Sequence, residues 1–189
     1  NYFRDGVWRK WTQRDGLIND GVRSLMVASN GDVWVASLFP VRLQRLRDGR
    51  VQVLENTTKL GALRAMAESA DGTVWIGTAE GEIQKVEGST LVAEPAIQEP
   101  VPLSIRCLLA TGDGSLWIGY AGEGLGRFKN GKYRRVTTAD GLADDYISQL
   151  LPDGRGNLWI TGNRGLWRVS ISELEAALAG PAPRLRVRA

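Results

Sequence analysis

The feature that most constrains this sequence is a short phrase that returns four times at nearly constant spacing. It reads DGTVWIGT at residues 71–78, and the other copies are NGDVWVAS (30–37), DGSLWIGY (113–120) and RGNLWITG (155–162). Successive tryptophans of the four copies are 41, 42 and 42 residues apart: Trp34, Trp75, Trp117 and Trp159. A fixed period of this kind indicates a repeat architecture in which each copy is one structural unit.

Each period has room for four short strands. An apolar-alternating stretch such as residues 105–111 precedes the phrase, and an apolar-x-basic-apolar segment such as residues 125–128 follows it. Asp-Gly or Asn-Gly turns between such segments favour tight hairpins, because both residues accept positive φ. Leucine-rich repeats are shorter, and helical solenoids would show a 3.6-residue period. We therefore predict an all-β fold, a β-propeller of four-stranded antiparallel blades, with about four blades present.

One segment departs from the strand pattern. Residues 171–179 (ISELEAALA) are good helix formers, with Ser172 and Glu175 spaced as a capping box and Gly180-Pro181 as a stop signal. We predict one short C-terminal helix there.

The composition removes several kinds of chemistry. The chain has no histidine, so these residues supply neither a Ser-His-Asp triad nor a His-ligated zinc site. Cys107 is the single cysteine and lies in an apolar run, which predicts an inert core thiol and no intrachain disulfide. The net charge is only +3 and scattered, which argues against a nucleic-acid partner. No apolar run approaches the roughly 18 residues of a membrane span, so we expect no membrane insertion by this segment.

These residues resemble the two-component regulator propeller repeat. The resemblance is carried by DGL at 15–17 and 140–142, Val22-x-Ser24-Leu25, the DGxLWIGT phrases, and GLxRF at 124–128. Ala36-Ser37 in the first copy and Arg155-Gly156 in the fourth depart from the pattern. The resemblance implies a sensor propeller in the extracytoplasmic, periplasmic part of a bacterial hybrid histidine kinase or diguanylate cyclase.

The repeat also divides the chain into blades. Residues 1–11 align with 126–136, which predicts that the chain begins in the second half of a preceding blade. The predicted divisions are 12–54 for blade 1, 55–93 for blade 2, 94–136 for blade 3, and 137–189 for blade 4 with its inserted helix. We expect a segment of a larger propeller, either an open arc whose end blades self-associate or a closed four-bladed ring.

The four repeated tryptophans are predicted to fill the gaps between neighbouring sheets, since one blade cannot bury both faces alone. The alternative is that they face the channel and stack on sugar rings. Gly77 and Gly119 follow two of these tryptophans, which indicates close approach by the neighbouring blade.

Ligand-binding residues are expected where the blades differ, on the loops of one rim. Phe39 and Tyr120 fall in loops that hold small residues in the other copies. They are candidates for an apolar or carbohydrate platform, and the alternative is loop packing.

A second candidate set lies on the first strand of each blade. Arg23, Arg64 and Arg106 hold the same repeat position, and Ser148 replaces them in the fourth copy. An arc of guanidinium groups near the axis would bind an anionic small molecule or an acidic carbohydrate. The alternative is that each arginine pairs with an acid of a blade, for which the candidates are Asp20, Glu68 and Asp145.

The acidic residues offer little catalytic promise. Asp144-Asp145 is the only adjacent acid pair, and neighbours in sequence rarely face the same substrate at the separation that glycosidase chemistry requires. Asp15 and Asp140 precede glycine and are predicted to be turn residues. No calcium-loop spacing is present, so no metal or cofactor is expected. The leading prediction is a non-catalytic ligand sensor. The alternatives are a protein-interaction scaffold and, disfavoured by the missing histidine, a propeller lyase.

Overall fold

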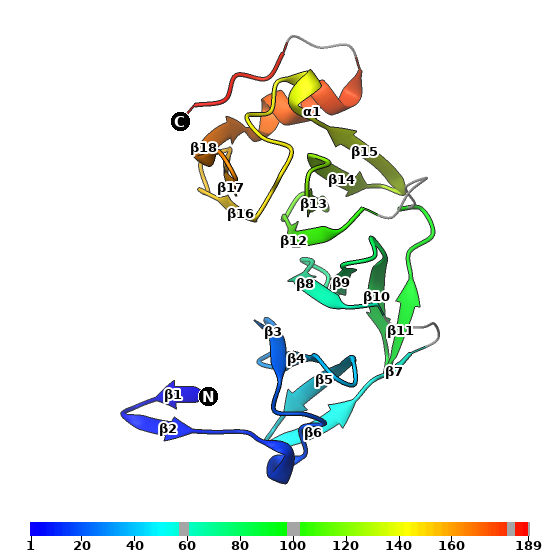
Figure 1. Ribbon diagram of the computed structural model, residues 1–189, viewed down its shortest axis with the longest axis vertical. Helices are drawn as coiled ribbons and strands as arrows, with labels where there is room; N and C mark the ends of the chain where they lie inside the picture. The colour runs from blue at the N-terminus through cyan, green and yellow to red at the C-terminus, as the bar shows by residue number, and fades with distance from the viewer. Residues whose placement is uncertain (57–60, 98–102, 181–183, 189) are drawn as a thin grey trace.

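The computed structural model describes residues 1–56, 61–97, 103–180 and 184–188, and it confirms the all-β propeller fold. Four sheets follow one another along an arc, with the first strand of each on the concave side (Figure 1). Blade 1 contains β3 (Val22–Val27), β4 (Val33–Ser37), β5 (Arg42–Arg47) and β6 (Arg50–Val53). Blade 2 contains β8 (Leu63–Glu68), β9 (Val74–Thr78), β10 (Ile83–Glu87) and β11 (Thr90–Ala93), joined at its outer edge by β7 (Glu55–Asn56).

The other two blades follow the same meander order. Blade 3 contains β12 (Ile105–Ala110), β13 (Leu116–Tyr120), β14 (Leu125–Lys129) and β15 (Lys132–Val136). Blade 4 contains β16 (Gln149–Pro152), β17 (Asn157–Gly162) and β18 (Gly165–Ser170). A two-stranded hairpin of β1 (Tyr2–Arg4) and β2 (Val7–Arg9) precedes blade 1.

The turns take the conformations that their residues favour. Asp48 and Gly49 have φ of 49° and 74°, and Asn130 and Gly131 have φ of 51° and 70°, so both outer hairpins turn through two left-handed residues. The DGL copies build a different element. Thr12 and Thr137 each cap a 3-10 helix (Gln13–Asp15 and Thr138–Asp140), and the backbone N–H of each capping threonine donates a hydrogen bond to the aspartate carboxylate of that helix.

Neighbouring blades pack face to face through three apolar clusters. In each cluster, one blade contributes the face that carries its repeated tryptophan and the next blade contributes its opposite face. Trp34, Trp75 and Trp117 are 4%, 9% and 1% exposed in the three successive clusters. Trp159 lies on the far face of blade 4, against which the described residues place no further sheet, and it is only partly buried.

The glycine after the tryptophan receives a side chain of the next blade. A Cβ at Gly77 would lie 2.6 Å from Ile105 Cγ2, and one at Gly119 would lie 2.7 Å from Ile147 Cγ2. Ile105 and Ile147 begin the inner part of blades 3 and 4 and are fully buried. The close approach is therefore made by an isoleucine side chain, not by backbone or an aromatic ring.

The predicted helix is present as α1 (Ile171–Ala179), and Leu174 and Leu178 pack it onto the cluster between blades 3 and 4. The predicted cap is wrong: Ser172 lies inside the helix, the N-cap is Ser170, and Ser170 makes no side-chain capping bond. After the helix, Arg188 exchanges two backbone hydrogen bonds with Arg168 of β18, at 2.7 and 2.9 Å. The returning chain thus contacts the outer edge of blade 4 at one bridge.

The arc is open within the described chain (Figure 1). Leu25 and Val27 on the outer face of blade 1 are 57% and 71% exposed, and they line an apolar hollow of about 510 Å³ beside the N-terminal hairpin. Leu151 and Leu166 on the outer face of blade 4 are similarly exposed. Within the described residues, no helix has the length and apolar character needed to cross a membrane.

Candidate functional site

The three inner-strand arginines share one backbone irregularity. In β8, Leu63 pairs with Thr78 and Ala65 with Gly77, so Arg64 is an extra residue with no partner on β9. The same shift occurs between Val22 and Ser24 in β3, and between Ile105 and Cys107 in β12. Each of Arg23, Arg64 and Arg106 is therefore the additional residue of a β-bulge. Bulges re-aim a side chain and are frequent near functional sites.

The alternative pairing with acids does not occur in the described residues. Asp20 accepts the backbone N–H of Gln13, and Asp145 accepts the backbone N–H and hydroxyl of Thr138. Glu68 accepts the backbone N–H and hydroxyl of Ser29, at 2.6 and 2.8 Å. These three carboxylates thus hold turns and connect loops, and they are not counter-ions for the inner arginines.

The arginines themselves remain available. Arg23 and Arg106 are exposed, and Arg64 is half-buried with its Nε hydrogen hidden from water and unpaired in the described structure. Across the described residues, none of the three makes a salt bridge. The inner edge of the arc therefore carries three cations that the fold itself does not use.

Tyr146 joins this edge, and the sequence reasoning missed it. The Arg106 guanidinium lies 5.5 Å from the centre of the Tyr146 ring, a cation–π contact between blade 3 and the loop that enters blade 4. Tyr146 directly precedes the buried Ile147, and the equivalent positions in the other blades hold Gly21, Ala62 and Ser104. An aromatic residue at this one position of the repeat was the signal available in the sequence.

The two predicted loop aromatics have different outcomes. Phe39 lies in the loop between β4 and β5 of blade 1 and is 76% exposed. The Asn19 side-chain amide donates a hydrogen bond to the Phe39 carbonyl. Tyr120 is 1% exposed, so its assignment to a ligand platform is wrong. It ends β13 and packs in the cluster between blades 2 and 3, where the Tyr133 hydroxyl donates to the Tyr120 hydroxyl at 2.9 Å.

The reason for the burial of Tyr120 lies in the neighbouring strand. A Cβ at Gly126 would lie 2.8 Å from the Tyr133 ring and 3.1 Å from the Tyr120 ring, so the glycine makes room for both tyrosines. Blades 1 and 2 place the buried Gln44 and Gln84 at the position of Gly126 and a small residue at the position of Tyr120. Blade 3 therefore has a large residue where blades 1 and 2 have a small one, and a small residue where they have a glutamine, so the two changes compensate each other in volume.

The repeated basic residue of the third strand is structural. Arg45, Arg127 and Arg168 lie directly across from a tryptophan of the second strand, and their guanidinium groups stand 5.8, 5.7 and 5.5 Å from the ring centres of Trp34, Trp117 and Trp159. These cross-strand pairs cover the tryptophan toward the outer edge of the blade.

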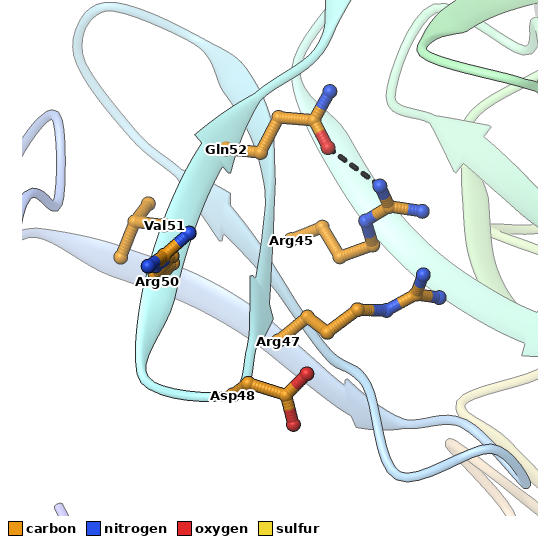
Figure 2. A pocket seen from close by; sticks show the side chains of 6 residues that line it. All are labelled: Arg45, Arg47, Asp48, Arg50, Val51 and Gln52. Atoms are coloured by element: carbon orange, nitrogen blue, oxygen red, sulfur yellow. Dashed lines mark hydrogen bonds between the residues drawn. The ribbon is translucent and has the colours of Figure 1, made fainter.

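The outer edges hold polar hollows whose cations are largely engaged. The hollow of blade 1, of about 570 Å³, is shown in Figure 2, where Arg45 and Arg47 extend on the same side of the hairpin. Arg45 donates to Gln52 at 2.5 Å, and Arg47 donates two bonds to the buried Asp32. The bond from Arg47 is the main reason that the pKa of Asp32 is lowered.

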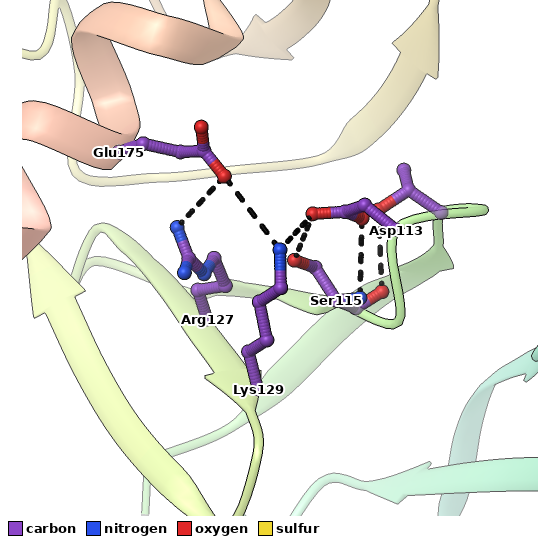
Figure 3. Close-up of polar contacts among 6 residues, drawn as sticks. Asp113, Ser115, Arg127, Lys129 and Glu175 are labelled. Atoms are coloured by element: carbon purple, nitrogen blue, oxygen red, sulfur yellow. Dashed lines mark hydrogen bonds and ion pairs between the residues drawn. The ribbon is translucent and has the colours of Figure 1, made fainter.

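A similar network joins blade 3 to the helix. Figure 3 shows Lys129 between Asp113, at 2.5 Å, and Glu175 of α1, at 3.8 Å, with Arg127 also reaching Glu175. Burial opposes ionisation of Asp113, but hydrogen bonds from Lys129, Thr111 and Ser115 outweigh it and hold its pKa below the ordinary value. The network is a structural tie between blade and helix.

Neither thiol nor metal chemistry is supported by the described residues. Burial raises the pKa of Cys107 to about 12, so the thiol stays protonated and unreactive at neutral pH. The described acidic and cysteine side chains form no group of three that could hold a metal ion.

Comparisons with known proteins agree with this architecture. Residues 141–164, which run from the second DGL turn through the repeat phrase of blade 4, match the family model "two component regulator propeller". The resemblance stated from the sequence is thereby confirmed. No curated protein sequence matches the chain.

Solved structures share the fold at low sequence identity. The extracellular domain of a hybrid two-component system from B. thetaiotaomicron is 24% identical with a TM-score of 0.63, and the match covers 80% of this chain and 22% of that one. PorZ, a surface component of the type-IX secretion system of Porphyromonas gingivalis, is 20% identical with a TM-score of 0.67, covering 90% and 29%. Virginiamycin B lyase from Staphylococcus aureus is 16% identical with a TM-score of 0.67, covering 91% and 57%.

These matches place the chain in the class of β-propellers, with a match to the two-component regulator propeller repeat over residues 141–164. The chain spans only 22–24% of the length of the two-component extracellular domains it resembles. At these identities the likeness establishes the fold alone.

Proposed function

We propose that this chain is part of the ligand-sensing propeller of an extracytoplasmic bacterial signalling receptor and that it does not catalyse a reaction. The observation that carries the proposal is the set of inner arginines, since three blades repeat an arginine at the same bulge and the described structure provides none of the three with an acidic partner. No carboxylate of the described residues neutralises these guanidinium groups, and a guanidinium is well suited to bind the two oxygens of an anionic group, which supports binding as the role of the repeated arginine.

Two further observations support the proposal. The match to the regulator propeller repeat and the shared fold with two-component extracellular domains support a sensor outside the cytoplasm. A variant of the similar lyase in which a histidine is replaced by alanine is described as catalytically inactive, and these 189 residues contain no histidine. The lyase fold is therefore shared without that catalytic group.

In such a receptor, binding at the inner edge would favour one arrangement of the receptor over another and so change the activity of a distant output module. A ligand can shift such an equilibrium only by the difference between its affinities for the two arrangements.

The test is a thermal-shift screen of the protein against acidic and neutral oligosaccharides and small organic acids, followed by mass spectrometry of the recovered ligand. A ligand at about 100 times its Kd should add about 2.7 kcal/mol of stability, roughly a 5–10 °C rise in Tm. Recovery of the ligand unchanged supports sensing. A chemically altered ligand would make the protein an enzyme, and the failure of every small molecule to bind would favour a protein-interaction scaffold.

A further inference from the structure

The inner arginines form an ordered row. The concave edge runs through β3, β8 and β12, and each of these strands places its arginine at the same bulge (Figure 1). Cα atoms of β8 come within 8 Å of both β3 and β12, so the row advances by one guanidinium for each blade. In blade 4 the position holds Ser148, and the cationic row ends there.

We propose that Arg23, Arg64 and Arg106 bind a linear polyanion, with one acidic group of the ligand for each blade. The inference rests on the sensing function proposed above and specifies its ligand. Guanidinium groups present parallel N–H donors that match the two oxygens of a carboxylate, sulfate or phosphate group. Because the three donors belong to successive sheets, a ligand with several acidic groups could meet one guanidinium on each blade.

The arrangement is prepared for such a ligand in two ways. A bulged residue is held by the strand on both sides of it, so the arginines are anchored on rigid elements and not on loops. The Tyr146 ring supports the Arg106 guanidinium at 5.5 Å, which limits its freedom before binding.

Arg64 should contribute most. It is the middle member of the row, and its buried Nε hydrogen has no acceptor in the described structure. A buried donor without a partner is unfavourable, so a shift of the Arg64 side chain that brings Nε to an acidic group of the ligand would supply the missing acceptor.

The outer basic surface fits the role less well. Arg47, Lys85, Lys129 and Arg135 each lie within 4 Å of a carboxylate. An anion binding at these four side chains would have to displace an existing partner, whereas an anion at the inner row would not.

The experiment measures binding of defined probes by isothermal titration at low and physiological salt. The polyvalent probes are trigalacturonate, a short dextran sulfate and tripolyphosphate, which distinguish carboxylate, sulfate and phosphate ligands. Galacturonate, inorganic sulfate and inorganic phosphate, each with a single acidic group, are the monovalent controls. Neutral dextran is the uncharged control. At least one polyvalent probe should bind about tenfold or more tightly than its monovalent control, because the second and third contacts are intramolecular. Added salt should weaken the binding.

Variants locate the site. Arg64→Gln should weaken the polyvalent probe about tenfold or more, and Arg23→Gln and Arg106→Gln should weaken it less. Arg50→Gln is the matched control, since it removes the same charge from the exposed outer hairpin of blade 1. It should leave binding within about twofold. Arg23→Gln, Arg64→Gln and Arg50→Gln should keep the unfolding temperature of the parent because these arginines have no salt bridge in the described structure, whereas Arg106→Gln should lower it slightly because it loses the contact with Tyr146.

Four results would overturn the polyanion proposal. Equal loss in Arg50→Gln would show attraction by net charge alone, and equal affinity for monovalent and polyvalent probes would show a single-anion site. Binding of only an uncharged ligand, unaffected by Arg64→Gln, would overturn the polyanion and leave the sensing function standing. Failure of every ligand in both experiments would overturn the two together.

Discussion

The two faces of blade 4 come from the same repeat and lie in opposite environments. The face toward blade 3 buries Leu158, Ile160 and Trp167, and α1 closes its outer margin. The other face leaves Trp159 partly exposed and Leu166 54% exposed. The repeated tryptophan therefore supplies a surface for packing, but the neighbouring sheet decides whether that surface becomes a core.

The largest expected effect tests this directly. Trp117→Ala should reduce the free energy of unfolding by about 3–5 kcal/mol, because the ring is 1% exposed between blades 3 and 4. Trp159→Ala, at the same repeat position, should cost roughly 1–2 kcal/mol because its ring is only partly buried. Urea unfolding followed by circular dichroism measures both. Equal losses would mean that the tryptophan acts within its own sheet and not between sheets.

A smaller effect sharpens the role of the glycine beside Trp117. In Gly119→Ala, the new Cβ would lie 2.4 Å from Cys107 Sγ and 2.7 Å from Ile147 Cγ2, so blade 4 has to shift. We expect a loss of about 1–3 kcal/mol in the same unfolding experiment. Gly112→Ala is the control, because no atom lies within 4 Å of its added Cβ. A tolerated Gly119→Ala would show that the two blades are more loosely packed than the structure has them.

The smallest effect concerns the outer margin of the same interface. The pKa of Asp113 is lowered in the folded protein, so its ionised form stabilises the fold above about pH 4, and this contribution is lost as the pH falls through the lowered value. Asp113→Asn should cost about 1 kcal/mol or less at pH 7, because the side chain is 41% exposed.

The variant should also lose less stability than the parent between pH 5 and pH 2, as followed by urea unfolding at each pH. Asp48→Asn, which removes the same charge from the outer turn of blade 1, should keep the parent's pH dependence. If the free energy of unfolding of Asp113→Asn and of the parent falls equally as the pH is lowered, Asp113 does not contribute to the acid response.

Much of the fold could be predicted because the repeat is written in the residues that packing requires. The spacing of the four tryptophans predicted four blades, Asp48-Gly49 and Asn130-Gly131 predicted tight turns, and the helix formers of 171–179 predicted α1. Each of these signals is local, or repeats at a fixed interval, so no knowledge of distant contacts was needed.

The candidate site was less accessible from sequence. The arginine positions were visible in the sequence, but their bulges were not. The bulge at Arg64 is a property of the pairing between β8 and β9, and Leu63 beside it packs against residues of blade 1. The burial of Tyr120 depends on Gly126 in another strand, and the contact of Arg106 with Tyr146 joins two blades. Such pairings arise only when the sheets are assembled.

The short strand β7 has a mechanical consequence. On leaving blade 1 the chain pairs in parallel with β11 at the outer edge of blade 2, where the Glu55 N–H donates to the Ser89 carbonyl at 3.0 Å. The connection from blade 1 therefore forms part of the sheet of blade 2. Any hinge motion between these two blades must first break that backbone pairing, so blades 1 and 2 should move as one rigid unit.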